Sequence, residues 1–215
     1  MSDEHLRELE RQWKKTGAVD DEAAYLLERI RVGDLDHAKL ELAAFVGHEG
    51  ARVAAPSALR VEALTDNQQV TKFLAQHGRE ALVRGLIASA RHAVEFWANS
   101  DEAPSIRGLP SAQAGLWAIE EWAVCPCDDH LECATRLGEA VEVGPMRFGS
   151  LYQVQTATRA ASAASLREAH HEVARLSLSH ERLREVGSEI ALWALGYSDV
   201  VRRRVEARQQ EAAGE

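Results

Sequence analysis

Apolar residues recur at intervals of three and four along most of this chain. Leu6, Leu9 and Trp13 follow this spacing near the N-terminus, and the stretch from Leu82 to Trp97 repeats it. Such a period places apolar side chains along one side of an α-helix. The sequence has no run of alternating β-branched residues between turns, so strands are not expected. The pattern predicts an all-α protein of about nine helices in antiparallel pairs, arranged as a bundle or a short HEAT-like solenoid.

Glycines, prolines and polar clusters divide this helical pattern into segments. Residues 1–55 contain three amphipathic stretches separated by Gly17 and Gly33, which predict a three-helix N-terminal module. Residues 66–215 are predicted to form the main helical domain. Turn-forming residues accumulate at 99–110, which is the expected boundary if the main domain has two lobes. One continuous domain is the alternative that the sequence leaves open.

Two helices are predicted in the C-terminal third of the chain. A long helix rich in alanine and serine is predicted over 151–176. The last helix is predicted to begin after a Ser198 cap and to run to about Gln210, with 211–215 frayed.

Charge and hydropathy limit the classes of function. The 215 residues carry a formal net charge of -9. Nonspecific nucleic-acid binding needs a basic surface, so a nucleic-acid partner is not expected. No apolar run approaches the roughly 20 residues that cross a bilayer, and the polar N-terminus has no signal-peptide pattern. We therefore expect a cytoplasmic protein without membrane contact, whose three cysteines are reduced thiols.

All three cysteines lie in one stretch, where a tryptophan-rich helix meets a proline. Cys125, Cys127, His130 and Cys133 offer the soft ligands that zinc and iron prefer. Pro126 disfavours helical geometry in the residue before it and suits the first position of the next helix. In a helix that begins at Pro126, Cys127 and Cys133 lie about 120° apart around the axis and roughly 9 Å apart along it. One ion cannot bind both.

The candidate metal site therefore comprises Cys125, Cys127 and His130, and its fourth ligand would come from elsewhere. His170 and His171 are of a suitable type. The structural interpretation, which we favour from the sequence, is a corner between two packed helices with both cysteines as small buried residues. A third interpretation is a reactive thiol near a helix N-terminus.

A basic patch lies on the last predicted helix. Arg202, Arg203, Arg204 and Arg208 either pair with acidic groups of the chain itself or bind an acidic partner, and they are the candidate partner-binding residues. Paired acids, such as those at 120–121, are interpreted as parts of polar helix faces.

Several stretches carry a resemblance. Residues 9–24 include Trp13 and the segment Gly-Ala-Val-Asp-Asp-Glu-Ala, residues 122–127 read Trp-Ala-Val-Cys-Pro-Cys, and 193–197 read Trp-Ala-Leu-Gly-Tyr. Over about half of its length the chain resembles a set of uncharacterised bacterial paralogues. The resemblance implies an all-helical fold and brings no catalytic residues. In style, with alanine-rich helix pairs and scattered tryptophans, the chain is also similar to immunity-type proteins, which neutralise a toxin by binding it.

Two functional hypotheses follow. The sequence contains no glycine-rich phosphate loop and no Gly-x-Ser-x-Gly segment. The leading hypothesis is therefore a non-enzymatic helical protein that binds another protein, as an inhibitor, an immunity protein or a regulatory scaffold, without a cofactor. The alternative is a metal-binding enzyme or sensor that holds zinc at Cys125, Cys127 and His130.

Overall fold

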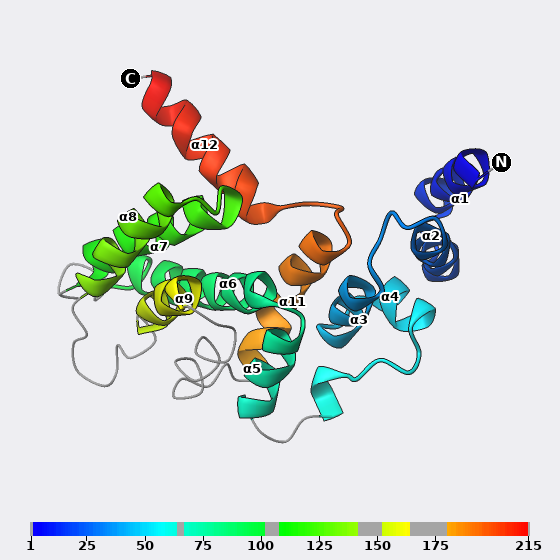
Figure 1. Cartoon of the computed structure of the whole chain (residues 1–215), viewed down its shortest axis with the longest axis horizontal. Coiled ribbons are helices and arrows are strands. Elements are labelled where there is room, and N and C mark those ends of the chain that lie inside the picture. The colour runs from blue at the N-terminus through cyan, green and yellow to red at the C-terminus, as the bar shows by residue number, and fades with distance from the viewer. Residues whose placement is uncertain (1, 64–66, 102–107, 142–151, 164–179, 215) are drawn as a thin grey trace.

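A computed structural model describes residues 2–63, 67–101, 108–141, 152–163 and 180–214. These residues form eleven α-helices and one short 3-10 helix, with no strand among them (Figure 1). The all-α prediction is confirmed, and the described helices outnumber the roughly nine that were predicted from apolar periodicity. None of them combines the length and the apolar character that spanning a bilayer requires.

The N-terminal part contains four helices rather than the three predicted. They are α1 (Ser2–Thr16), α2 (Val19–Arg31), α3 (His37–Phe45) and α4 (Glu49–Ala54), and α2 packs against both α1 and α4. Helix α4 was not predicted because it has only six residues and a histidine at its N-cap. Histidine is not among the usual capping residues.

One helix, α6, forms the centre of the molecule. The 3-10 helix η1 (Val61–Ala63) and α5 (Asn67–Gln76) precede α6 (Arg79–Ala98), which packs against α5, α7, α9 and α11. Thirteen of its 20 residues are buried. A helix buried on most of its circumference belongs in the interior, and its buried set includes Arg84, Ser89 and Arg91 as well as the recurring apolar residues between Leu82 and Trp97.

Three helices pack together on one side of α6. They are α7 (Leu109–Val124), α8 (Asp128–Glu139) and α9 (Tyr152–Ser162). A glycine allows α8 and α9 to approach closely, because a Cβ atom at Gly138 would lie 2.5 Å from Thr158 Oγ1. Of the long helix predicted over 151–176, the structure describes α9, and residues 164–179 lie outside the described part of the chain.

Two C-terminal helices connect the parts of the fold. Helix α11 (His180–Ala194) packs against both α3 and α6, and a Cβ atom at Gly187 would lie 2.5 Å from the Val46 carbonyl oxygen. Helix α12 (Val200–Gly214) packs against α7 and then extends away from the body of the molecule, drawn in red in Figure 1.

The predicted limits of the last helix need correction. The α12 cap is Asp199 rather than Ser198, because Asp199 Oδ1 accepts a hydrogen bond from the Arg202 amide at 3.0 Å. The helix also continues to Gly214, beyond the predicted end. Of the predicted boundary loop at 99–110, residues 102–107 lie outside the described residues.

Candidate metal centre

A tight turn joins α7 to α8 at the cysteine cluster. Helix α7 ends at Val124, as predicted, and Cys125 follows with an extended backbone. The Cys127 amide donates a hydrogen bond to the Cys125 carbonyl oxygen at 2.8 Å, which closes a three-residue γ-turn around Pro126. Helix α8 therefore begins at Asp128 with Cys127 as its N-cap, and the predicted start at Pro126 is wrong.

This turn brings three soft ligands together. The ligand atoms of Cys125, Cys127 and His130 all lie within 4.8 Å of one another. Cys127 Sγ is 3.2 Å from His130 Nδ1, which also lies 3.1 Å from the Cys125 carbonyl oxygen. Cys133 is not part of the cluster and packs partly against the core, in agreement with the geometric argument from the sequence.

The favoured structural interpretation of this stretch is wrong in one respect. Cys125 and Cys127 are both exposed rather than buried as small packing residues. A free cysteine is more often buried than exposed, so two exposed thiols beside a histidine indicate a site that solutes can reach.

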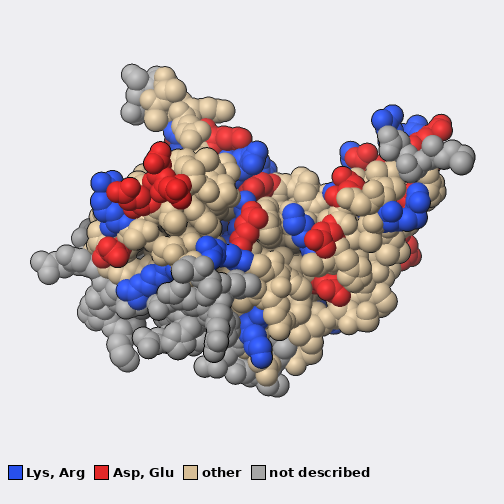
Figure 2. Space-filling model, in the orientation of Figure 1, with Lys and Arg blue, Asp and Glu red and all other residues tan. Residues whose placement is uncertain are grey.

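Negative charge surrounds the cluster. Asp128 and Asp129 occupy the first turn of α8, and acidic side chains gather over this helix in Figure 2. A hydrogen bond with Cys127, together with desolvation and the charge of that thiol, holds the pKa of Cys125 above its ordinary value. A bound cation would act in the opposite direction, because a nearby positive charge favours the thiolate form of Cys125.

The ligand set fits a borderline or soft metal ion. Thiolate and imidazole groups suit zinc, copper and iron, whereas magnesium and calcium prefer oxygen ligands. Three protein ligands leave the fourth position of a tetrahedral ion to water or to another molecule. His170 and His171, the ligands of suitable type noted in the sequence, lie outside the described residues.

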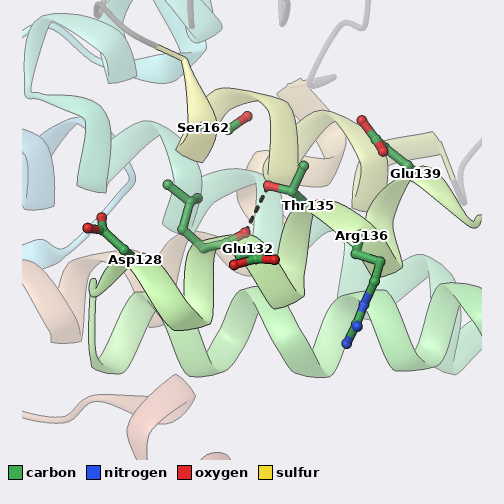
Figure 3. Close-up of a pocket in the computed structure, with 7 residues that line it drawn as sticks. Asp128, Glu132, Thr135, Arg136, Glu139 and Ser162 are labelled. Atoms are coloured by element: carbon green, nitrogen blue, oxygen red, sulfur yellow. Dashed lines mark hydrogen bonds between the residues drawn. The ribbon is translucent and has the colours of Figure 1, made fainter.

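A groove of about 450 Å³ runs along α8 on a different face (Figure 3). Its lining residues follow one side of the helix and end at α9; they are Asp128, Leu131, Glu132, Thr135, Arg136, Glu139 and Ser162. None of the three candidate ligands lines it. The Thr135 hydroxyl donates to the Leu131 carbonyl at 2.8 Å, so this polar side chain is satisfied within its own helix.

The predicted basic patch is divided between two environments. Arg204 and Arg208 turn inward toward Glu120, whose side chain is fully buried: Arg204 Nε lies 3.4 Å and Arg208 Nη1 2.7 Å from its carboxylate oxygens. Arg202 and Arg203 are exposed. The four arginines therefore do not form one continuous surface for a partner.

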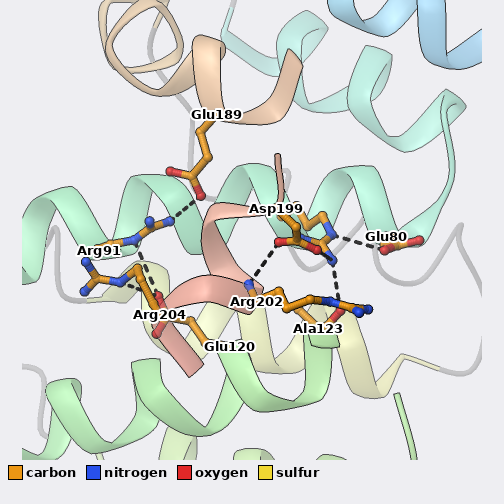
Figure 4. Close-up of polar contacts among 9 residues, drawn as sticks. Glu80, Arg91, Glu120, Ala123, Glu189, Asp199, Arg202 and Arg204 are labelled. Atoms are coloured by element: carbon orange, nitrogen blue, oxygen red, sulfur yellow. Dashed lines mark hydrogen bonds and ion pairs between the residues drawn. The ribbon is translucent and has the colours of Figure 1, made fainter. Parts of the chain in front are cut away.

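Glu120 is the residue that sequence reasoning missed. It was interpreted as part of a polar face, yet it is 0% exposed and also lies 3.4 Å from Arg91 Nε (Figure 4). The spacing of residues in α7 could have indicated its burial. Glu120 follows Leu116 by four residues and precedes Ala123 by three, and both of these residues are buried. That spacing places Glu120 on the buried side of α7.

Arg84 joins the end of α7 to the N-cap of α12. Arg84 donates to both carboxylate oxygens of Asp199 at 3.0 Å and to the Ala123 carbonyl oxygen at 3.0 Å. Its guanidinium carbon lies 4.7 Å from the Trp193 ring centroid. Burial opposes the charge of Asp199, but the hydrogen bonds from Arg84 and the Arg202 amide hold the pKa of this carboxyl below its ordinary value.

Comparison with known proteins adds no family to this description: no protein-family model, no curated protein and no solved structure matches the chain.

Proposed function

We propose that this protein binds a thiophilic transition-metal ion, zinc first among them, and acts as a metal sensor or carrier. The observation that carries the proposal is the proximity of the ligand atoms of Cys125, Cys127 and His130, all within 4.8 Å of one another. Tetrahedral zinc holds thiolate and imidazole ligand atoms about 3.6 Å apart. Small side-chain rotations would bring the three groups to that separation.

Exposure favours a sensor or carrier over an enzyme. Both cysteines are exposed, so a bound ion would keep an open position toward solvent. Catalytic metal sites keep such a position inside a cleft that holds the substrate and excludes water. An ion on an exposed turn can instead pass to another ligand. The proposal places the protein in the cytoplasm, where thiols stay reduced.

Cobalt titration of the metal-free, reduced full-length protein tests this proposal. Thiolate-to-cobalt charge-transfer absorption should rise and reach its plateau at one equivalent. Cys127→Ser should weaken cobalt binding by more than about 100-fold. Removal of a residue that only hydrogen-bonds to a metal ligand typically weakens metal binding by about 10- to 100-fold, and this substitution removes a ligand itself. Cys133→Ser is the matched control on the same helix and should bind as the wild type does. Absence of the charge-transfer band in the wild type would refute the site.

Protein binding is a second candidate function, and one groove favours it. Trp117, which is 43% exposed, and Arg208 line a groove of about 440 Å³ between α7 and α12. The side chains of α12 from Gln209 to Ala213 are exposed. An exposed aromatic ring beside a projecting helix suits recognition of a protein partner. Under this proposal the helix pairs form a bundle or short HEAT-like scaffold for an inhibitor or immunity role.

Removal of the projecting part of α12 tests this second candidate. A chain that ends at Arg208 should lose a stoichiometric partner that the full chain recovers from native lysate. Trp117→Ala should weaken recovery by about 10-fold or more if the ring is an interface anchor. Phe96→Ala is the control, because Phe96 is 61% exposed and does not line the groove. Equal recovery by all variants would contradict this role for the groove.

A further inference from the structure

The γ-turn at Pro126 places two thiols where they can form a disulfide. Disulfides need Cα atoms about 4.4–6.8 Å apart, and a γ-turn draws the first and third residues together. The hydrogen bond from the Cys127 amide to the Cys125 carbonyl oxygen holds this geometry at 2.8 Å. The two sulfur atoms already lie within 4.8 Å of each other.

The two thiols are not equivalent. Cys127 Sγ contacts the imidazole of His130 at 3.2 Å, whereas the contact of His130 with Cys125 is to its backbone carbonyl. Cys127 is also the N-cap of the 12-residue helix α8, and no side chain caps the free amides there. His130 is therefore placed to take up the Cys127 proton as that sulfur attacks, and it makes no such contact with the Cys125 sulfur. Asp128 and Asp129 lie in the first turn of α8, directly after this contact.

We propose that this cysteine pair is a thiol–disulfide exchange site for low-molecular-weight disulfides, with Cys127 as the attacking thiol and Cys125 as the resolving thiol. The Cys127 proton passes to His130, and the thiolate attacks one sulfur of the small disulfide. A mixed disulfide forms, and the first small thiolate leaves and takes up a proton from His130.

Cys125 then completes the exchange. Its thiol loses a proton and its sulfur attacks Cys127 Sγ, which forms the Cys125–Cys127 disulfide and releases the second small thiol. In total the two protein thiols lose two electrons and two protons, and the small disulfide gains them. An oxidised pair offers no thiolate to a metal ion, so oxidation would release the ion. This last consequence rests on the proposed metal function, whereas the exchange itself does not.

Glutathione disulfide and metal-free full-length protein provide the test, followed by mass spectrometry and peptide mapping. The wild type should lose the mass of two hydrogen atoms and yield a Cys125–Cys127 disulfide. Cys125→Ser should accumulate a glutathione adduct on Cys127. Cys127→Ser should form its adduct on Cys125 at least about 10-fold more slowly, because the His130 imidazole makes its hydrogen-bond contact with the Cys127 sulfur and not with the Cys125 sulfur. Both cysteines are exposed, so neither serine variant removes core packing.

Three results would overturn the proposal: equal adduct rates in the two serine variants, a stable glutathione adduct on the wild type without an internal disulfide, or modification of Cys133 first. Because this experiment contains no metal, its failure is separate from failure of the metal site. In a second arm with zinc-loaded protein, zinc should appear in solution at the rate of disulfide formation. Disulfide formation without zinc release would support the exchange site and contradict the metal site.

Discussion

At the scale of single residues, His48 shows how a neutral histidine can stabilise a helix. Its Nδ1 accepts a hydrogen bond from the Ala51 amide at the start of α4, and its Nε2 lies 3.7 Å from Glu22. Burial lowers the pKa of His48, and the nearby carboxylates of Glu22 and Glu49 oppose this effect without reversing it. Protonation would remove the acceptor on Nδ1 if the proton settled there.

This arrangement predicts that stability declines as pH falls. The unfolded histidine titrates near its ordinary pKa of about 6.5, and the folded state binds the proton less readily. Below that pH the unfolded state holds more protons, so acidification from pH 7.5 to about 5 should lower the free energy of unfolding. His48→Asn keeps a capping side chain that does not titrate, and urea unfolding should show a smaller loss for it. An equal loss in both proteins would contradict the assignment.

The residues of the candidate metal site could be predicted from the sequence, but the solvent exposure of its cysteines could not. The candidate metal ligands Cys125, Cys127 and His130 were chosen from the sequence by ligand type and helix geometry, and their ligand atoms lie close together in the structure. Their exposure was not predicted. Pro126 fits a helix start as well as a γ-turn, and the choice between these depends on how α8 packs rather than on local preference.

At the scale of elements, α12 is held to α7 by buried charge. Glu120 is fully buried and lies within 3.4 Å of a guanidinium from Arg91, Arg204 and Arg208. Arg204 also contacts Glu95 at 3.0 Å. The apolar contribution of α12 is small, with Val201 and Val205 as its buried residues. The position of this helix therefore depends on the Glu120 carboxylate.

Neutralising that carboxylate should be costly. Glu120→Gln removes the carboxylate that Arg208 pairs with, and leaves Arg91 and Arg204 with Glu189 and Glu95 alone. Breaking a buried ion pair from one side typically costs about 3–5 kcal/mol. Urea unfolding should report a loss of this size. Glu121→Gln, the neighbouring substitution on a partly exposed side chain, should change the free energy of unfolding by less than about 0.5 kcal/mol. Similar values for the two variants would show that the buried charges contribute little.

Helix limits were predictable where local chemistry decides them. The end of α7 at Val124 follows from the proline two residues later, and the end of α11 at Ala194 follows from Gly196, which has a φ of 70°. The start of α12 was misplaced by one residue because Ser198 and Asp199 can both serve as caps. Asp199 takes the role because its carboxylate is also fixed by Arg84 from a distant helix.

At the scale of the whole molecule, the first helix meets the turn before the last one. Trp13 of α1 stacks on Tyr197 with ring centroids 4.9 Å apart, and Arg29 of α2 donates to the Leu195 carbonyl oxygen at 2.5 Å. The segments 9–24 and 193–197, which are far apart in the sequence, thus lie in contact. Apolar periodicity identifies each helix but carries no information about which distant helices pair, so these contacts could not be predicted.

Elemental analysis of the purified protein tests the proposed metal site. Protein purified without a histidine tag should carry close to one equivalent of a transition metal by elemental analysis, since thiolate sites hold zinc tightly enough to survive purification. The Cys125→Ser, Cys127→Ser double variant should lose that metal, and Cys133→Ser should keep it. Less than about 0.1 equivalents of any transition metal in the fully reduced wild type would contradict the account.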